Sequence, residues 1–136
     1  MKIKSTFELL KKIREMAIAP YSNFRVGAVL MTKKGKLFTG LNIESSSYGL
    51  TICAERVALF KALSEGEDEF QHISILSDAR DFCPPCGACR QVLMDFAPDI
   101  EVILYNNQGE SATYLLKDLL PDAFTPARLT SSNRNK

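Results

Sequence analysis

Two short segments of this 136-residue sequence combine residue types that bind and use a metal ion: Cys53-Ala54-Glu55 and Pro85-Cys86-Gly87-Ala88-Cys89. A Cys-x-x-Cys pair on the first turn of a helix can place both sulfurs on one Zn2+, and Cys53 can supply a third sulfur. Three protein ligands leave the fourth tetrahedral position open for water, as in catalytic zinc sites. Glu55 follows Cys53 by two residues, so it can lie beside the metal and act as a base.

The two segments together match a signature of zinc deaminases of nucleobases, in which a ligand-x-Glu triplet precedes Pro-Cys-x-x-Cys. Three thiolates carry one more negative charge than Zn2+ neutralises, which makes the metal a weaker Lewis acid. A hydrogen-bond donor near the sulfurs would offset this charge. Arg56 directly follows Glu55 and is predicted to donate to a ligand sulfur; a solvent-facing helix residue is the alternative.

The fourth cysteine, Cys83, leaves other metal and redox sites open. Cys83, Cys86 and Cys89 have the spacing of part of an iron–sulfur motif, although the Cys-Pro that ends such a motif is missing. A redox dithiol would use Cys83 and Cys86 alone, and a closed structural zinc site would use all four cysteines. The stiff Cys83-Pro84-Pro85 segment favours a Cys83 that does not bind the metal.

Hydrophobic periodicity predicts an α/β fold. A strand hairpin comes first, and strands then alternate with helices, which indicates a central mixed β-sheet of about five strands with helices packed on its faces. A polar, serine-rich loop over 42–51 interrupts the pattern and is long enough to have a function. The predicted helices cover 6–17, 53–64, 86–96 and 116–120, and the predicted strands cover 26–32, 37–41, 73–76, 101–105 and 111–114.

Composition indicates one compact domain, predicted over 1–126, followed by a polar, flexible tail over 127–136. The net charge is only +1, and binding to nucleic acid usually needs a clustered basic surface, so no nucleic-acid partner is expected. No apolar stretch has the length of a membrane span, and the charged N-terminal segment is unlike a secretory signal. We therefore expect no membrane partner and a cytoplasmic protein whose four cysteines stay reduced.

Further motifs accompany the zinc signature, and in combination they resemble the small homotetrameric cytidine deaminases. These motifs run from Ala19 to Ala28, over Asn42-Ile43-Glu44, from Cys53 to Arg56, and from Pro85 to Gln91. The similarity extends from about residue 7 to Phe124. It implies a three-layer α/β/α fold, one Zn2+ per subunit, and a homotetramer with active sites at the subunit interfaces.

The resemblance also implies a role for individual residues. Cys53, Cys86 and Cys89 would bind zinc, and Glu55 would be the catalytic proton shuttle. Asn42 and Glu44 would hydrogen-bond the ribose, Phe24 would pack on the pyrimidine, and the Ala54 backbone with Glu55 would hold the amide edge of the base. Tyr48 and Phe124 would reach the active site of a neighbouring subunit.

Some of these residues have simpler interpretations. Phe24 can be an ordinary core residue, Asn42 and Glu44 can be turn residues, and Phe124 can pack the end of the chain. The only histidine, His72, lies far in sequence from both motifs and is interpreted as structural.

The implied activity is the hydrolytic deamination of cytidine and 2′-deoxycytidine, for which no organic cofactor is needed. The loop departs from the family at Ser45-Ser46-Ser47, where Asn-Ala-Ala is expected, and at Thr51-Ile52, where a more polar pair is expected. These departures leave the fine substrate preference open. The alternatives are a blasticidin-type nucleoside-antibiotic deaminase, a polynucleotide-editing deaminase and a non-catalytic zinc-binding scaffold.

Overall fold

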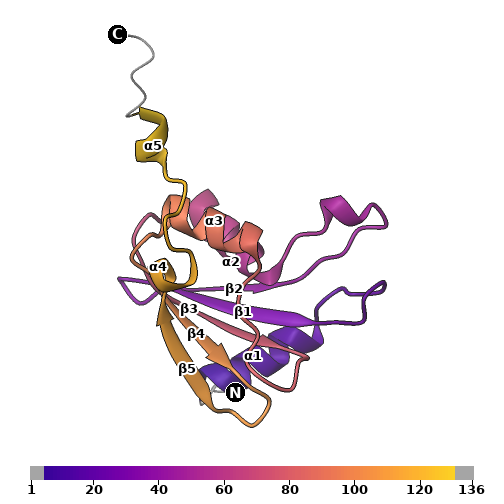
Figure 1. Cartoon of the computed structure of the whole chain (residues 1–136). Coiled ribbons are helices and arrows are strands. Elements are labelled where there is room, and N and C mark those ends of the chain that lie inside the picture. The colour runs from indigo at the N-terminus through magenta and orange to yellow at the C-terminus, as the bar shows by residue number, and fades with distance from the viewer. Residues whose placement is uncertain (1–4, 131–136) are drawn as a thin grey trace.

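A five-stranded mixed β-sheet forms the centre of the molecule in the computed structural model, which describes residues 5–130 (Figure 1). The strand order is β2-β1-β3-β4-β5, and β3–β4 is the parallel pair, whereas the other neighbours are antiparallel. The α/β class and the mixed sheet predicted from the sequence are thus confirmed. The strands are β1 (Val26–Thr32), β2 (Leu37–Leu41), β3 (Phe70–Ser77), β4 (Glu101–Tyr105) and β5 (Ser111–Leu115).

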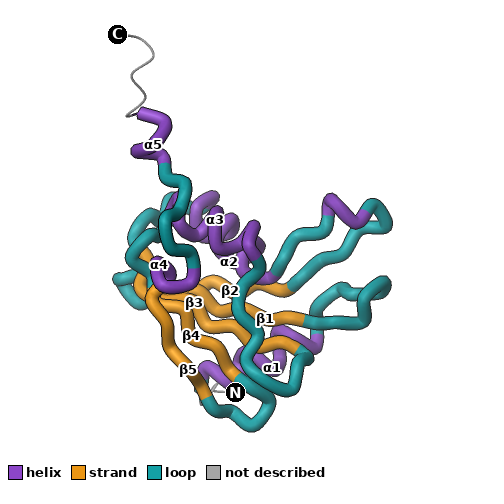
Figure 2. The backbone as a smooth tube through the Cα atoms, viewed as in Figure 1, coloured by secondary structure: helices purple, strands orange, loops and turns teal. Residues whose placement is uncertain are grey.

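Helices cover both faces of the sheet and complete three layers (Figure 2). Side chains alternate along β1, so Ala28 and Leu30 pack against one layer while Val29 packs against the other. The first layer contains α2 (Ala54–Ser64) and α3 (Gly87–Phe96), and the second contains α1 (Thr6–Glu15). The shorter helices are η1 (Tyr48–Leu50), α4 (Leu116–Leu119) and α5 (Pro126–Thr130).

The fold brings the N-terminal ends of α2 and α3 together. Cys53 is the N-cap of α2 and Cys86 is the N-cap of α3, and both have extended backbone conformations. Neither thiol caps its own helix through a side-chain hydrogen bond. The segment that carries Cys86 follows the C-terminal end of β3, the edge where ligands commonly bind in α/β sheets.

The predicted elements agree with the observed ones to within a few residues, with three differences. Helix η1 lies inside the segment over 42–51 that is predicted as a loop. β3 begins at Phe70 and not at Ile73, so His72 lies inside the strand. The helix α5 was not predicted, because its five residues include a proline and show too little periodicity to signal a helix. It occupies the start of the predicted tail, and residues 131–136 lie outside the described residues. None of the helices within 5–130 has the length and apolar character needed to cross a membrane.

The close contact between β2 and α2 depends on a glycine. A Cβ atom at Gly40 would lie 2.2 Å from the carbonyl oxygen of Ala54 and 2.6 Å from the amide nitrogen of Ala58. Both atoms belong to the helix backbone, so they cannot move aside as a flexible side chain would. Gly40 therefore sets the distance at which the Cys53-bearing end of α2 lies from the sheet.

We expect Gly40→Ala to lower the free energy of unfolding by about 3 kcal/mol, because α2 must move away from β2. Chemical denaturation monitored by circular dichroism measures this change. Gly49→Ala is the matched control, since a Cβ there meets no atom within 4 Å, and it should change the unfolding free energy by about 1 kcal/mol or less. Equal stability of the two variants would contradict the close-contact argument.

Candidate active site

Three cysteine sulfurs lie together where α2 and α3 begin. The Sγ atoms of Cys53, Cys86 and Cys89 all lie within 4.8 Å of one another, and those of Cys53 and Cys86 are 3.7 Å apart. Tetrahedral zinc with Zn–S bonds of about 2.3 Å holds its sulfurs about 3.8 Å apart. The donor set therefore fits a zinc ion. Within residues 5–130 this is the one such group of three or more His, Cys, Asp or Glu side chains, and Cys83 and Glu55 are not part of it.

The surroundings of the sulfurs favour a thiolate at Cys53. A hydrogen bond with the Cys89 thiol and another from Arg56 lower the pKa of Cys53 to about 5, although partial burial opposes ionisation. The Nη2 atom of Arg56 lies 3.5 Å from the Cys53 sulfur, so Arg56 makes the contact that the sequence predicted. The pKa of Cys89 is raised by its hydrogen bond to Cys53 and by burial. A dication among the sulfurs would stabilise all three as thiolates.

Glu55 is a buried acid beside the sulfurs. Its residue is 5% exposed, and burial raises the pKa of its carboxyl to about 7. The negative charge of Cys53 contributes to this rise, while Arg56 opposes it. A carboxyl with a pKa near neutrality can both take up and release a proton at physiological pH.

Cys53, Cys86 and Cys89 are called the metal-binding group below. A cavity of about 240 Å³ opens beside this group and Glu55. It brings together seven of the residues predicted from the sequence, which come from four separate stretches of the chain: Phe24, Asn42, Glu44, Cys53, Ala54, Glu55 and Cys86. A second hollow of about 270 Å³ shares three lining residues with it, namely Ser22, Glu44 and Thr51. The two hollows are thus adjacent.

Asn42 is buried and holds the chain on both sides of Arg25. Its Oδ1 accepts a hydrogen bond from the Val26 amide at 2.8 Å, and its Nδ2 donates to the Phe24 carbonyl at 2.9 Å. This bridge fixes the backbone from which the Phe24 ring projects. One N–H of the Asn42 amide is left over for a ligand.

Glu44 closes the 21–22 turn against the mouth of the cavity. Its Oε1 accepts hydrogen bonds from the backbone amides of Tyr21 at 2.9 Å and Ser22 at 3.1 Å, and the Ser22 hydroxyl donates to Oε2. The hydrogen bonds from Ser22 lower the pKa of Glu44. Glu44 is therefore an ionised acceptor with lone pairs left for hydroxyl groups of a ligand.

Tyr48 and Phe124 do not line the cavity that contains Glu55. Tyr48 is 74% exposed and lines the second hollow, where its ring lies 5.8 Å from that of Tyr21. Phe124 is 56% exposed, and its carbonyl accepts a hydrogen bond from Gln91 at 2.7 Å. Within one chain, neither aromatic side chain completes the cavity.

The structure adds residues that the sequence motifs did not single out. Cys83 and Pro84 line the cavity, although Cys83 had been assigned no role. Arg90 donates hydrogen bonds to the Pro85 carbonyl at 2.8 Å and to the Leu119 carbonyl at 3.0 Å, so it anchors the segment before Cys86. The contact with Leu119 joins residues 29 positions apart in the sequence, and a motif does not reveal it.

Comparisons with known proteins agree with this geometry. Residues 1–105 match the family described as the cytidine and deoxycytidylate deaminase zinc-binding region. A cytidine deaminase from Halalkalibacterium halodurans is 51% identical over 113 residues, which cover 82% of this chain and 86% of that protein. A probable cytidine deaminase from Dictyostelium discoideum is 44% identical, with 90% of this chain and 84% of that protein covered.

Solved structures show the same similarity. The crystal structure of cytidine deaminase from Burkholderia pseudomallei matches with a TM-score of 0.84 and 49% identity, covering 91% of this chain and all of that one. The cytidine deaminase from Mycobacterium tuberculosis matches with a TM-score of 0.73 and 32% identity, covering 88% of this chain and 98% of that one.

Zinc content distinguishes the three clustered cysteines from Cys83. We expect Cys86→Ala to purify with far less than one zinc per chain, because two sulfurs bind the ion too weakly to retain it. Cys83→Ala is the matched control and should retain zinc at the wild-type level, as measured by inductively coupled plasma mass spectrometry. Loss of zinc in both variants would show that all four cysteines hold the metal.

Proposed function

Because this chain belongs to the cytidine and deoxycytidylate deaminase family with a zinc-binding region, we propose that it hydrolyses free cytidine and 2′-deoxycytidine to uridine and 2′-deoxyuridine. Water supplies the oxygen at C4, the C4–N bond breaks, and ammonia leaves. The observation that carries this proposal is the buried Glu55 in one cavity with a three-sulfur group that fits zinc. The reaction would serve the salvage of pyrimidine nucleosides.

Cys53, Cys86 and Cys89 would hold one zinc ion per chain. An ion held there would supply Lewis acidity and would lower the pKa of a water molecule that it binds. Arg56 withdraws negative charge from the sulfurs through its hydrogen bond to Cys53. The N-terminal ends of α2 and α3 add partial positive charge on the same side.

Glu55 would move the protons. It accepts one proton from the attacking water and donates it to N3 of the pyrimidine. It then accepts the second proton of the same oxygen, now bonded to C4, and donates it to the departing amino group. Burial favours this role, because the raised pKa of about 7 makes both protonation states accessible near neutral pH. Glu55 is only 5% exposed, so little bulk water reaches its carboxylate.

The remaining cavity residues would orient the nucleoside. The Phe24 ring packs on the pyrimidine, and the backbone of Ala54 with the carboxyl of Glu55 holds the amide edge of the base. Asn42 and Glu44 hydrogen-bond the sugar. Asn42 donates its remaining amide N–H, and Glu44 accepts through its remaining carboxylate lone pairs. The ionised Glu44 repels a phosphate group, which favours nucleosides over nucleotides.

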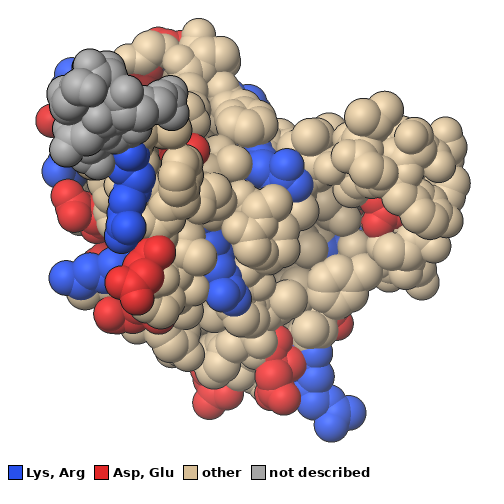
Figure 3. Space-filling view, turned by 45° about the horizontal axis from the view of Figure 1, so that its top comes forward, with Lys and Arg blue, Asp and Glu red and all other residues tan. Residues whose placement is uncertain are grey.

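A small-molecule substrate also suits the charge of the chain, whose net value is only +1. On the face shown in Figure 3, basic and acidic side chains are interspersed, and the right-hand part of this face is nearly free of charge. No continuous basic stripe crosses this view, as binding to a nucleic-acid backbone would require. A cytosolic location would suit the assigned thiolate ligands, because that compartment keeps thiols reduced.

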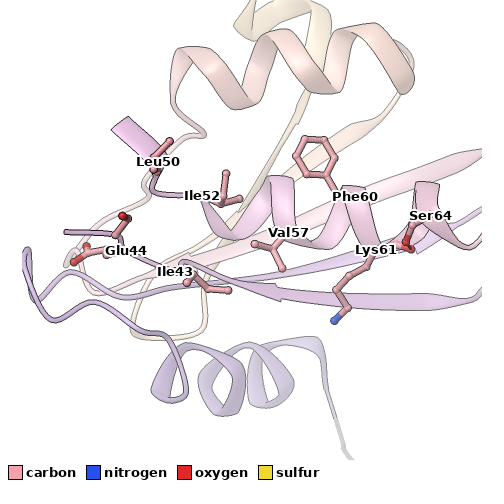
Figure 4. A pocket seen from close by; sticks show the side chains of 9 residues that line it. Ile43, Glu44, Leu50, Ile52, Val57, Phe60, Lys61 and Ser64 are labelled. Carbon is pink, nitrogen blue, oxygen red and sulfur yellow. Dashed lines mark hydrogen bonds between the residues drawn. The ribbon is translucent and has the colours of Figure 1, made fainter. Parts of the chain in front are cut away.

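We further propose a homotetramer with its active sites at subunit interfaces. The helix α2 buries Ala58 and Leu59 in the core, yet its outer side also presents Val57 and Phe60 to an apolar groove of about 520 Å³ (Figure 4). A helix that is apolar on opposite sides is usually covered on both. Phe60 is 43% exposed, and a second copy of the chain would cover it. Assembly would also place Tyr48 and Phe124 against neighbouring sites.

The test of the reaction is a comparison of the zinc-loaded wild type with Glu55→Gln. We expect the wild type to convert cytidine with release of ammonia. The loss of cytidine is monitored by its ultraviolet absorbance. The Glu55→Gln variant should retain zinc but lose activity by about 10⁴-fold, because its amide cannot accept a proton.

The matched control is Glu15→Gln, which changes an exposed glutamate at the end of α1. It should keep wild-type activity. Full activity of Glu55→Gln would exclude Glu55 as the proton carrier, and an inactive, zinc-loaded wild type would refute cytidine as the substrate.

Assembly is tested by Phe60→Glu, which places a charge in the apolar groove. We expect this variant to have a smaller mass by analytical ultracentrifugation and a lower activity, because an unpaired buried charge opposes association. Glu65→Gln at the far end of α2 is the control and should leave the mass unchanged. A wild type that sediments as a monomer at assay concentration would contradict the proposed tetramer.

A further inference from the structure

Cys83 lies in the wall of the cavity, three residues before the metal-binding Cys86. It is half-buried, and its sulfur lies outside the metal-binding group. Its recorded hydrogen bond is a weak one, from Sγ to the Pro84 carbonyl at 3.9 Å. When the other three cysteines hold zinc, Cys83 is the remaining free thiol of a four-cysteine chain.

We propose that Cys83 forms the wall that faces C5 of the pyrimidine and thereby limits the size of the C5 substituents that the enzyme accepts. The inference rests on the proposed function, since it needs the base to be seated with C4 beside the sulfurs. With C4 in that place, the residues that line the cavity determine where the N3 edge and the C5 edge of the pyrimidine lie.

The start of α2 and the 83–86 segment approach the metal-binding group from different elements. Ala54 and Glu55, at the start of α2, line the cavity. They take the edge that contains N3 and the 2-carbonyl, because backbone N–H groups and the protonated Glu55 carboxyl can donate to these two acceptors. C5 is bonded to C4 on the side away from N3. Cys83 and Pro84 line the cavity and directly precede Cys86 in the chain, so we assign the C5 edge to this segment.

This wall is rigid. Pro84 and Pro85 restrict the backbone, and Arg90 holds the Pro85 carbonyl at 2.8 Å. A rigid wall cannot move back from a larger substituent, so the volume of the side chain at position 83 decides what fits. The thiol is small and apolar, which leaves room for hydrogen or a small group at C5 and disfavours a bulky one.

The test compares the ratio of kcat/KM for 5-methylcytidine to kcat/KM for cytidine in three variants. We expect Cys83→Leu to lower this ratio at least about 10-fold, the usual effect of a methyl group in a tight pocket. Cys83→Ala should raise the ratio, because it enlarges the space at C5. Cys83→Ser preserves the volume and is the matched control, so its ratio should stay at the wild-type value.

The proposal is supported if Cys83→Leu lowers the ratio of kcat/KM values and Cys83→Ala raises it. A purely structural defect would lower kcat/KM for both substrates alike and leave the ratio unchanged. An unchanged ratio in both Cys83→Leu and Cys83→Ala would overturn it. Cytidine turnover by the wild type is measured first, so a failure of the proposed reaction is distinguished from a failure of this inference.

Alkylation of Cys83 gives a readout that does not depend on turnover. Zinc-loaded wild type is treated with iodoacetamide in the presence or absence of uridine, and the modified residue is identified by mass spectrometry. We expect uridine to slow the modification of Cys83, because the bound base covers the thiol. An equal rate of modification with saturating uridine would overturn the proposal.

Discussion

The convergence of two helix N-termini on one group of sulfurs is the constraint on which the rest of the molecule depends. Cys53 and Cys86 occupy N-cap positions, and neither thiol is used to cap its own helix. The sulfurs are thus free for a metal, and the helix ends favour their ionisation. Three thiolates in contact would repel one another, so the arrangement needs a cation among them and a donor such as Arg56 beside them.

Several distant contacts maintain this convergence. Gly40 lets α2 lie against β2, and Arg90 ties the segment before Cys86 to the chain near α4. Asn42 fixes the segment before β1 that carries Phe24, while Glu44 fixes the neighbouring turn. Residues proposed to touch the nucleoside therefore also hold the cavity in shape. Substituting Asn42 or Glu44 would disturb the site in two ways at once.

The sequence allowed much of the fold and the metal site to be predicted, because both depend on local spacing. Strands β1 and β4 were predicted with their observed limits, and the Cys-x-x-Cys spacing at the start of a helix predicted the group that the structure brings together. The short helix α5 was missed, because its five residues include Pro126 and show too little periodicity to signal a helix. The place of Cys83 in the cavity wall was also missed, since a fold sets it and a motif does not.

The central claim is that three sulfurs hold zinc and leave one position open for water, and X-ray absorption spectroscopy of the zinc-loaded protein tests it most directly. The account predicts three sulfur atoms at about 2.3 Å and one oxygen atom at about 2.0 Å from the metal. Four sulfurs around the zinc would contradict it, because Cys83 would then close the site and no position would remain for the attacking water.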